Sequence, residues 1–245
     1  MEKRFFTESS NTLLEKGVLV GADSSIEWLL PWWWENYSRC NTLPVAFVDF
    51  GLTEGAKKFC QERGILIPLD SLPHEMFVST NPEWAKSYGA SYERARQGWF
   101  KKPLALLKSP FEITLWTDLD CEILKSLDSL FSLAKEGPYL SLARDISDHD
   151  SPYPIYNGGV ILYRKGNLLL QEFAKRALTD AKHFWGDDRL LSFLIDRDSL
   201  AVDPLPSHYN WRIAQGIPAG VAIIHWVGEW GKSYIKTYGG ISSLL

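Results

Sequence analysis

Two carboxylates follow a strongly β-prone run in the middle of the chain. Asp118 and Asp120 end the run 113–117, and their spacing would put both side chains on one side of an extended backbone. Neighbouring carboxylates repel each other unless a cation lies between them. The pair therefore predicts a hard divalent ion, Mn²⁺ or Mg²⁺, with coordination positions left open for phosphate oxygens. A solvated strand end is the alternative interpretation, because this triplet often occurs by chance.

Three further residues that could take part in chemistry lie later in the chain, one histidine and two aspartates. His225 ends the apolar run 221–226, and imidazole is a good ligand for Mn²⁺. Asp187 and Asp188 stand where a helix is expected to begin. The alternatives are a histidine with ordinary hydrogen bonds and a carboxylate stabilised by the helix dipole.

A pair of glycines precedes another β-prone run. In Tyr156-Asn157-Gly158-Gly159 the missing side chains would let the backbone approach a ligand closely. An ordinary junction between a loop and a strand is the alternative.

The elements that must position these residues alternate along the chain. Strands are expected at 17–22, 44–50, 65–67, 113–117, 139–143, 158–163, 200–205 and 221–226. Helices are expected at 53–63, 84–107, 125–135, 167–180 and 187–196. One more helix should open with a capping box of Ser24 and Glu27, and Pro31 should kink or restart it. The alternation predicts an α/β fold with a largely parallel sheet, whose ligands lie beyond the carboxyl ends of the strands.

Composition limits the classes of protein and partner. The 245 residues carry 26 Lys and Arg against 30 Asp and Glu, so the net charge of −4 offers no field for a nucleic-acid backbone. The apolar fraction of 45% predicts one folded domain over 1–245, with 1–16 irregular. Eleven tryptophans hint at a sugar or nucleotide ligand, although they could also serve a core.

The spacing of the cysteines and the length of the apolar runs indicate the cellular compartment of the protein. Cys40, Cys60 and Cys121 are odd in number and widely spaced, which predicts a reducing compartment without a disulfide framework. No apolar run is long enough for a membrane span, and no signal peptide is expected. The expectation is a cytoplasmic protein that could attach peripherally to the inner face of a membrane.

Several of these segments resemble one family in order. The stretch from Asp118 to Phe131 resembles the D-x-D segment of nucleotide-sugar glycosyltransferases of the GT-A type, particularly glycosyltransferase family 8. The helix-like run from Lys102 resembles the basic helix before it, and Asn157-Gly158-Gly159 resembles the N-x-G strand. The run 185–191 resembles the D-Q-x-x-L helix start, with Asp188 where the family usually has Gln.

Further resemblances lie near the two ends of the chain. The segment 221–232 resembles the family's strand that ends in H-x-x-G and is followed by a lysine. His225 matches the histidine, and Lys232 comes one residue later than the usual lysine. Ala22-Asp23 resembles the end of the family's first strand. The family usually has an aromatic residue a few positions later, and Ile26 or Trp28 lies near that position here. The segment 205–210 resembles L-P-x-x-Y-N, which forms either a wall of the acceptor site or a structural loop.

The resemblance implies a single GT-A, Rossmann-like domain with a donor half at about 17–124 and an acceptor half at about 125–245. The implied metal ligands are Asp118, Asp120 and His225, and the implied catalytic residues are Asp188, near the anomeric carbon, and Asp187. The implied donor contacts are Ala22, Asp23, Lys102, Asp118, Asn157, Gly158, Gly159 and Lys232. The implied reaction is metal-dependent transfer of a sugar from a nucleotide sugar, a UDP-sugar by the family pattern, to an acceptor hydroxyl with retention of configuration.

Two other functions compete with this one. In a phosphohydrolase of the haloacid-dehalogenase kind Asp118 would be the nucleophile. There the pair ends the first strand, whereas about 100 residues precede it here, and Cys121-Glu122 replaces the usual Gly-Thr. The other alternative is a degenerate GT-A domain that binds a glycan or nucleotide without turnover. The sugar, the glycan, lipid-linked or protein acceptor and the oligomeric state stay open.

Overall fold

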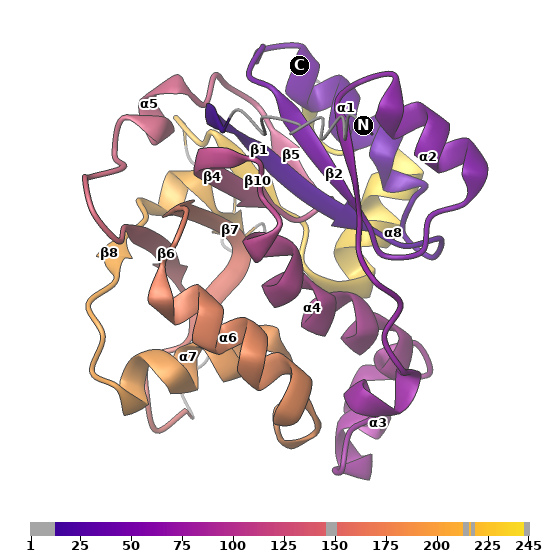
Figure 1. Cartoon of the computed structure of the whole chain (residues 1–245). Helices are drawn as coiled ribbons and strands as arrows, with labels where there is room; N and C mark the ends of the chain where they lie inside the picture. The colour runs from indigo at the N-terminus through magenta and orange to yellow at the C-terminus, as the bar shows by residue number, and fades with distance from the viewer. Residues whose placement is uncertain (1–12, 146–150, 213–215, 217–218, 243–245) are drawn as a thin grey trace, which may run out of the picture.

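A seven-stranded mixed sheet forms the centre of the molecule. The computed structural model describes residues 13–145, 151–212, 216 and 219–242. The strand order is β3-β2-β1-β4-β7-β6-β8 (Figure 1). The strands are β1 (Leu14–Ala22), β2 (Val45–Asp49), β3 (Ile65–Pro68), β4 (Phe111–Thr117), β6 (Leu140–Arg144), β7 (Tyr156–Arg164) and β8 (Asp203–Pro204). Only β7 runs antiparallel to its neighbours, so the expected mainly parallel sheet is confirmed.

Helices cover both faces of this sheet. They are α1 (Leu29–Ser38), α2 (Glu54–Gln61), α3 (Pro82–Tyr88), α4 (Tyr92–Leu107), α5 (Asp128–Phe131), α6 (Leu168–Thr179), α7 (Asp187–Arg197) and α8 (Gly228–Tyr238). Alternate side chains of β1 enter different cores: Val18 and Val20 pack on the α1 side, and Leu19 packs with residues of α4, α6 and α7. Burial on both faces explains why these strands read as continuous apolar runs.

A second, small sheet shares a hydrophobic core with β1 and β2. It consists of β5 (Cys121–Ile123), β10 (Ile223–His225) and β9 (Trp211–Arg212). The antiparallel pairing of β5 with β10 places Cys121 opposite His225. The predicted strand 221–226 therefore exists, in shortened form, but belongs to this small sheet rather than to the central one.

The predicted start of the first helix is wrong. Helix α1 begins at Leu29 without a side-chain cap, and Ser24 caps nothing. Instead Glu27 accepts hydrogen bonds from the backbone N–H and hydroxyl of Thr53, the residue that caps α2. Pro31 stands in the first turn of α1, where its missing N–H leaves no intrahelical bond unmade.

Other boundaries also differ from the sequence prediction. The helix expected at 84–107 is two helices, α3 and α4, because Gly89 takes a positive φ of 107° between them. The helix expected at 125–135 shrinks to the single turn α5, and the strand expected at 200–205 shrinks to β8. Residues 14–16 belong to β1 rather than to an irregular segment, and the residues before 13 lie outside the described part of the chain.

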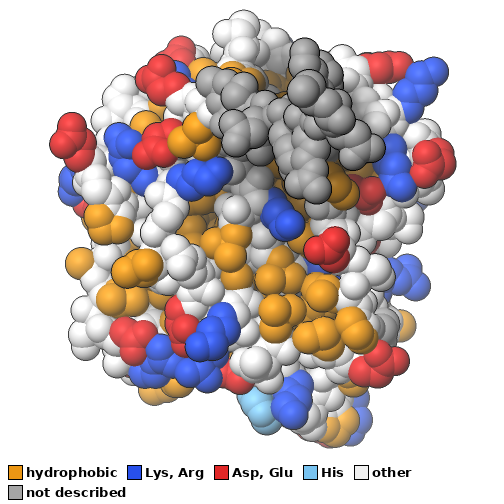
Figure 2. Space-filling model, viewed as in Figure 1, with side chains coloured by type: hydrophobic (Ala, Val, Ile, Leu, Met, Phe, Trp, Pro, Cys, Tyr) orange, Lys and Arg blue, Asp and Glu red, His pale blue; other side chains and the backbone are white. Residues whose placement is uncertain are grey.

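The surface agrees with the charge balance. In the view of Figure 2 basic and acidic side chains are interspersed, and neither sign covers a large area. Among the described residues, no helix is both long and apolar enough to cross a membrane.

Candidate active site

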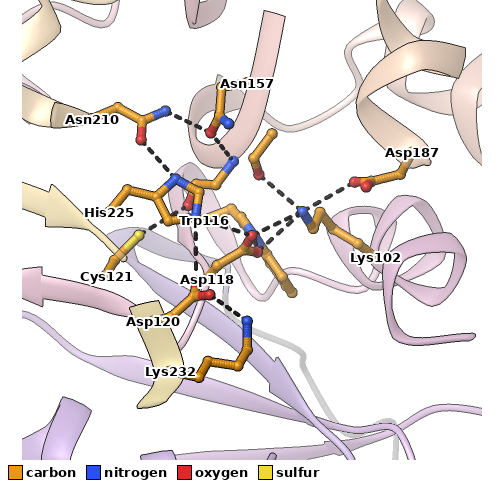
Figure 3. A network of polar contacts seen from close by, with 12 residues as sticks. Lys102, Trp116, Asp118, Asp120, Cys121, Asn157, Asp187, Asn210, His225 and Lys232 are labelled. Atoms are coloured by element: carbon orange, nitrogen blue, oxygen red, sulfur yellow. Dashed lines mark hydrogen bonds and ion pairs between the residues drawn. The ribbon is translucent and has the colours of Figure 1, made fainter. Parts of the chain in front are cut away.

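The two aspartates of the D-x-D triplet lie in the turn between β4 and β5. The backbone N–H of Cys121 donates to the carbonyl of Asp118 at 3.1 Å, so the chain here turns and is not extended as predicted. The carboxylates converge nevertheless. The Nε2 atom of His225 lies 3.4 Å from Asp120 Oδ1 and 3.9 Å from Asp118 Oδ2 (Figure 3). The structure thus brings together the three predicted metal ligands from β4, the turn and β10.

A chain of hydrogen bonds defines which nitrogen of His225 faces the carboxylates (Figure 3). The backbone N–H of Gly159 donates to Asn157 Oδ1 at 2.9 Å, and the amide of Asn210 donates to the same oxygen at 3.0 Å. The remaining oxygen of Asn210 then faces His225 Nδ1, at 3.0 Å. Because an oxygen can only accept there, Nδ1 carries a hydrogen, and a neutral ring presents the lone pair of Nε2 to the two aspartates.

This arrangement tests whether a cation fits the site. In a neutral ring the lone pair of His225 Nε2 and the oxygens of Asp118 and Asp120 are all acceptors, pointed at a common space. Octahedral ligands at about 2.1 Å from an ion lie about 3 Å apart. The 3.4 Å between His225 and Asp120 is close to this spacing, whereas the 3.9 Å to Asp118 is longer, so Asp118 would have to move closer to share the ion. Two carboxylates with an imidazole suit Mn²⁺ or Mg²⁺, so the residues present fit the predicted ion.

Cys121 is a neighbour of this site that the sequence did not indicate as a ligand. Asp120, Cys121 and His225 form a buried group that could hold a metal ion. Burial raises the pKa of the Cys121 thiol well above its usual value, and the thiol donates to the carbonyl of Gly159 at 3.6 Å. A protonated thiol is a poor ligand, so the oxygens of Asp118 are the better partners for a hard ion.

Gly159 is required by the close approach of β7 to β10. A side chain at this position would collide with the imidazole ring of His225. The predicted close approach of a ligand to Gly159 stays a prediction, because the neighbour seen here is the imidazole of His225. Gly158 differs, because its neighbours are Asp187 and Lys102, and its carbonyl accepts from Lys102 at 3.1 Å.

Lys102 of α4 joins the D-x-D turn to the start of α7. Its amine lies 3.1 Å from Asp118 Oδ1 and 3.0 Å from Asp187 Oδ2, and the residue is only 4% exposed. Burial opposes the charge, but the two carboxylates outweigh it and raise the pKa of the amine. Lys102 therefore holds the two acidic elements together in this structure.

Lys232 of α8 occupies the equivalent place on the other aspartate. Its amine lies 2.7 Å from Asp120 Oδ2. Burial would raise the pKa of Asp120, yet the positive charge of Lys232 and the contact with His225 hold it well below its usual value. Each carboxylate of the triplet thus has its own lysine.

Asp187 and Asp188 begin α7 as predicted. Burial raises the pKa of Asp187, and the amine of Lys102 only partly opposes that effect. Burial of the carboxyl among protein atoms, together with the negative charge of Asp187, raises the pKa of Asp188 to about 7. Asp188 is thus a carboxyl that changes its charge near neutral pH.

Two connected cavities meet at the D-x-D turn. The larger, about 380 Å³, is lined by Asp23, Trp28 and the α8 side chains that face it. The smaller, about 170 Å³, is lined by Asn157, Asp187 and Asp188 and is called the recess below. The side chains that line both are Tyr88, Trp99, Lys102, Asp118, Asp120 and Lys232.

The remaining predicted contacts have defined places. Asp23 lines the larger cavity, where its Oδ1 accepts hydrogen bonds from the N–H and hydroxyl of Ser25. Ala22 is buried, and its carbonyl accepts from Phe50. Trp28, which is 41% exposed, lines the cavity near the position where the family has an aromatic.

The segment 205–210 is not a wall of the recess. Asn210 belongs to the hydrogen-bond chain behind His225, and Leu205 and Asn210 line a separate cavity of about 260 Å³. Sequence reasoning missed these contacts because the partners of Asn210 are far away in the chain, His225 at 15 residues and Asn157 at 53.

Arg96 of α4 is a second buried contact that the sequence does not indicate. Its guanidinium is fully buried and donates to the carbonyls of Phe77, Ala181 and Trp185, each at 2.8 Å. The charge thereby fastens α4 to the segment that precedes α7. A charged residue in a helical pattern normally marks the exposed face, so nothing in the sequence signalled this burial.

The fold is shared with several solved glycosyltransferases of the GT-A type. The galactosyltransferase LgtC, in complex with donor and acceptor sugar analogs, superimposes with a TM-score of 0.64 at 13% identity, covering 87% of each chain. GlyE of Streptococcus pneumoniae TIGR4 gives 0.61 at 17% identity and covers 94% of this chain and 61% of that one. Mouse xyloside xylosyltransferase 1 gives 0.52 at 13% identity and covers 86% and 97%.

These likenesses confirm the predicted fold. The chain has the GT-A fold, and at such low identity the likeness extends to the fold alone. No family model matches the sequence, and no curated protein matches it. The roles of the site residues must therefore be argued from their own geometry.

Proposed function

We propose that this protein is a metal-dependent glycosyltransferase. It would move a sugar from a nucleoside-diphosphate sugar, by the family pattern a UDP-sugar, to an acceptor hydroxyl with retention of configuration. The observation that carries the proposal is the convergence of Asp118, Asp120 and His225 at the junction of the two cavities. The larger cavity would take the nucleotide of the donor, and the recess would take the sugar that is transferred.

The larger cavity suits a nucleotide. Trp28 offers an exposed ring for stacking, and the carboxylate of Asp23 keeps Oδ2 for a hydrogen-bond donor of a base. Lys102 and Lys232 lie where they could contact a diphosphate beside the D-x-D turn. Asn157, Gly158 and Gly159 lie beyond this turn, toward the sugar end of such a donor.

A divalent ion on Asp118, Asp120 and His225 would supply positive charge against the departing diphosphate. The bond between the anomeric carbon and the phosphate oxygen breaks, and a bond from the acceptor oxygen to that carbon forms. The acceptor proton leaves with the diphosphate. Asp188, in its charged form, would stabilise positive charge that develops at the anomeric carbon or attack that carbon directly, and Asp187 would hold Lys102 in place.

The cysteines agree with the expected compartment. Cys60 and Cys121 are buried, Cys40 is partly exposed, and all three are free thiols. We propose a reducing, cytoplasmic location on this basis.

The first experiment measures nucleotide binding by quenching of tryptophan fluorescence. UDP, GDP, CDP and ADP are titrated with Mn²⁺ and, separately, with EDTA. Asp120→Asn removes a ligand charge at constant shape, and Asp203→Asn, in a surface ion pair with Lys135, is the matched control. We expect UDP to bind only with Mn²⁺ and Asp120→Asn to weaken binding at least about tenfold.

Each other outcome has a definite meaning. Metal-dependent binding of another nucleotide keeps the transferase and overturns the preference for UDP. Binding without turnover of any sugar nucleotide identifies a degenerate domain. A failure of every diphosphate to bind, with or without metal, refutes the donor site and favours the phosphohydrolase, which release of phosphate from small phosphoesters would detect.

A further inference from the structure

A buried glutamate next to the D-x-D turn has no part in the proposed reaction. Glu122 lies two residues after Asp120, in β5, and is fully buried. Its carboxylate accepts three hydrogen bonds, from the indole of Trp226 at 2.9 Å and from the backbone N–H groups of Ile241 at 3.1 Å and Ser242 at 2.6 Å. A buried carboxylate that collects donors from two other segments holds those segments together.

The donors to Glu122 come from both ends of α8. The tryptophan lies two residues before this helix, and the two backbone donors follow shortly after its last residue. One carboxylate thus closes a ring that contains the whole helix. The helix has few other anchors, because only Gly231 and Ile235 of its 11 residues are buried.

Residues 239–242, called the clip below, also contact α1. The indole of Trp32 donates to the carbonyl of Gly239 at 2.8 Å, and the hydroxyl of Ser242 donates to Asn36 Oδ1 at 2.7 Å. The clip therefore fastens the end of α8 to α1 as well as to the glutamate.

Gly240 allows the clip to approach the carboxylate. It has a positive φ of 83°, and a Cβ at this position would lie 2.6 Å from Oε2 of Glu122. The backbone conformation and the available space both require glycine here. A side chain at this position would therefore push the clip away from the carboxylate while leaving the glutamate itself unchanged.

Helix α8 forms one wall of the larger cavity. It supplies Glu229, Ser233 and Lys236 to the lining. It also supplies Lys232, whose amine lies 2.7 Å from Asp120 Oδ2 (Figure 3). The position of α8 thus decides the width of this cavity and the place of the amine beside the D-x-D turn.

We propose that Glu122 is a positioning residue for the nucleotide donor. By holding both ends of α8, it keeps Lys232 beside Asp120, so that less conformational freedom is lost when a diphosphate binds. This inference rests on the proposed function, because it takes the larger cavity as the nucleotide site. Linkage makes the effect reciprocal: a nucleotide that prefers the held helix must favour the contacts of the clip by the same factor.

The first test breaks the contact from either side. Glu122→Gln keeps the size of the side chain, but an NH₂ group replaces one acceptor and faces an N–H donor. Gly240→Ala leaves the glutamate intact and displaces the clip. We expect each variant to bind the nucleotide, UDP by expectation, about tenfold more weakly in the presence of Mn²⁺. Tryptophan fluorescence titration measures this affinity.

Each variant has a matched control. Gly166→Ala introduces the same backbone strain, at a φ of 82°, but open space surrounds a Cβ there. Glu112→Gln changes a glutamate in a partly exposed ion pair with Arg164, at the start of β4. Both controls should bind the nucleotide as the wild type does.

Hydrogen exchange tests the reciprocal effect, which a merely structural contact would not show. In the wild type the nucleotide with Mn²⁺ should slow exchange in the peptide that contains the N–H groups of Ile241 and Ser242, compared with Mn²⁺ alone. Without any ligand, Glu122→Gln and Gly240→Ala should speed exchange there and in α8.

The inference and the proposed function fail in different ways. If the wild type binds a nucleotide with Mn²⁺ and the variants bind it equally well, the positioning role is refuted and the transferase stands. The same holds if the nucleotide leaves exchange at the clip unchanged. If Glu122→Gln does not fold, Gly240→Ala and the exchange of the wild type decide the question. If the wild type binds no nucleotide, both are refuted, because there is then no donor to position.

Discussion

The two cavities are built by different means. Ends of the central strands supply Gly21, Asp23, Trp116 and Asp118 to the larger cavity, and these positions follow from the sheet. Tyr88 of α3 and Trp99 of α4 line both cavities. The recess differs by the segment that leads into α7, where the carbonyl of Trp185 accepts from the buried guanidinium of Arg96. Strand pairing thus fixes one side of the larger cavity, whereas the α7 side of the recess depends on a few side-chain contacts. The second kind of construction can change its ligand without changing the sheet.

The largest expected effect is on kcat, and it tests whether Asp188 takes part in the reaction without binding the donor nucleotide. Asp188→Asn should lower kcat by about 10²–10⁴-fold, because it removes the charge beside the anomeric carbon. The affinity for UDP with Mn²⁺ should stay the same. Steady-state kinetics and fluorescence titration give the two values, and Asp198→Asn, at the other end of α7, is the control. Unchanged kcat in Asp188→Asn would remove this residue from the reaction.

The second prediction tests whether the recess depends on Arg96. Arg96→Met keeps the unbranched apolar stem of the side chain but leaves the carbonyls of Phe77, Ala181 and Trp185 without their donor. We expect the free energy of unfolding to fall by about 2–4 kcal/mol. Urea denaturation measures this loss. Among the molecules that remain folded, UDP should bind normally and kcat should fall, because the segment that leads into Asp187 and Asp188 loses its contact with Arg96. Equal losses on both sides would show that the cavities are not built independently.

The third prediction concerns the hydrogen-bond chain behind His225. Asn210→Leu removes the oxygen that holds the proton on Nδ1, and Mn²⁺ affinity should fall about 10–100-fold. Asn210→Asp keeps an acceptor at this place and should recover most of the affinity. Electron paramagnetic resonance of free Mn²⁺ measures both without reference to activity. Equal affinity in Asn210→Leu and the wild type would show that Asn210 does not position the ligand.

The smallest effect is a dependence on pH. Because the pKa of Asp188 is raised to about 7, kcat should rise as pH increases through 7 and the carboxylate forms. The raised pKa of Asp188 has the opposite effect on the free energy of unfolding, which falls as the pH increases. The folded chain binds the proton more tightly than the unfolded chain, so this stabilisation is complete below about pH 4 and is lost as pH rises through 7.

Asp188→Asn should remove the stability difference that this carboxyl causes between pH 5 and 8, as urea denaturation at the two values would show. A wild-type profile of kcat that is flat from pH 6 to 8 would contradict the assignment.

Much of the fold could be predicted because buried parallel strands have a clear sequence signal. Strands such as β2 and β7 are continuous apolar runs, and the polar residues at strand ends mark the site. Strands β5 and β9 have three and two residues, too few for any periodicity. The break at Gly89 had a signal, since a glycine interrupts the helical pattern, but the aromatic run around it concealed the break.

The site could be predicted in part for the same reason. Asp118, Asp120 and His225 converge as expected, although the backbone between the aspartates turns instead of extending. The amide contacts of Asn210 and the burial of Arg96 could not be predicted, because both depend on pairings between segments far apart in the chain. Lys102 and Lys232 were predicted as diphosphate contacts, and that role stays a prediction beside their observed ion pairs.

The ion pair of Lys232 with Asp120 joins residues 112 positions apart. The unfolded chain would have to close a loop of this length before the acidic turn and α8 could meet, and loop closure has an entropic cost. The site therefore assembles only when the chain is folded, and an ion bound there would favour the folded state by mass action. At a concentration a hundred times its dissociation constant this amounts to about 2.7 kcal/mol. The melting temperature of the protein should thus rise with the Mn²⁺ concentration, without a donor, an acceptor or any turnover.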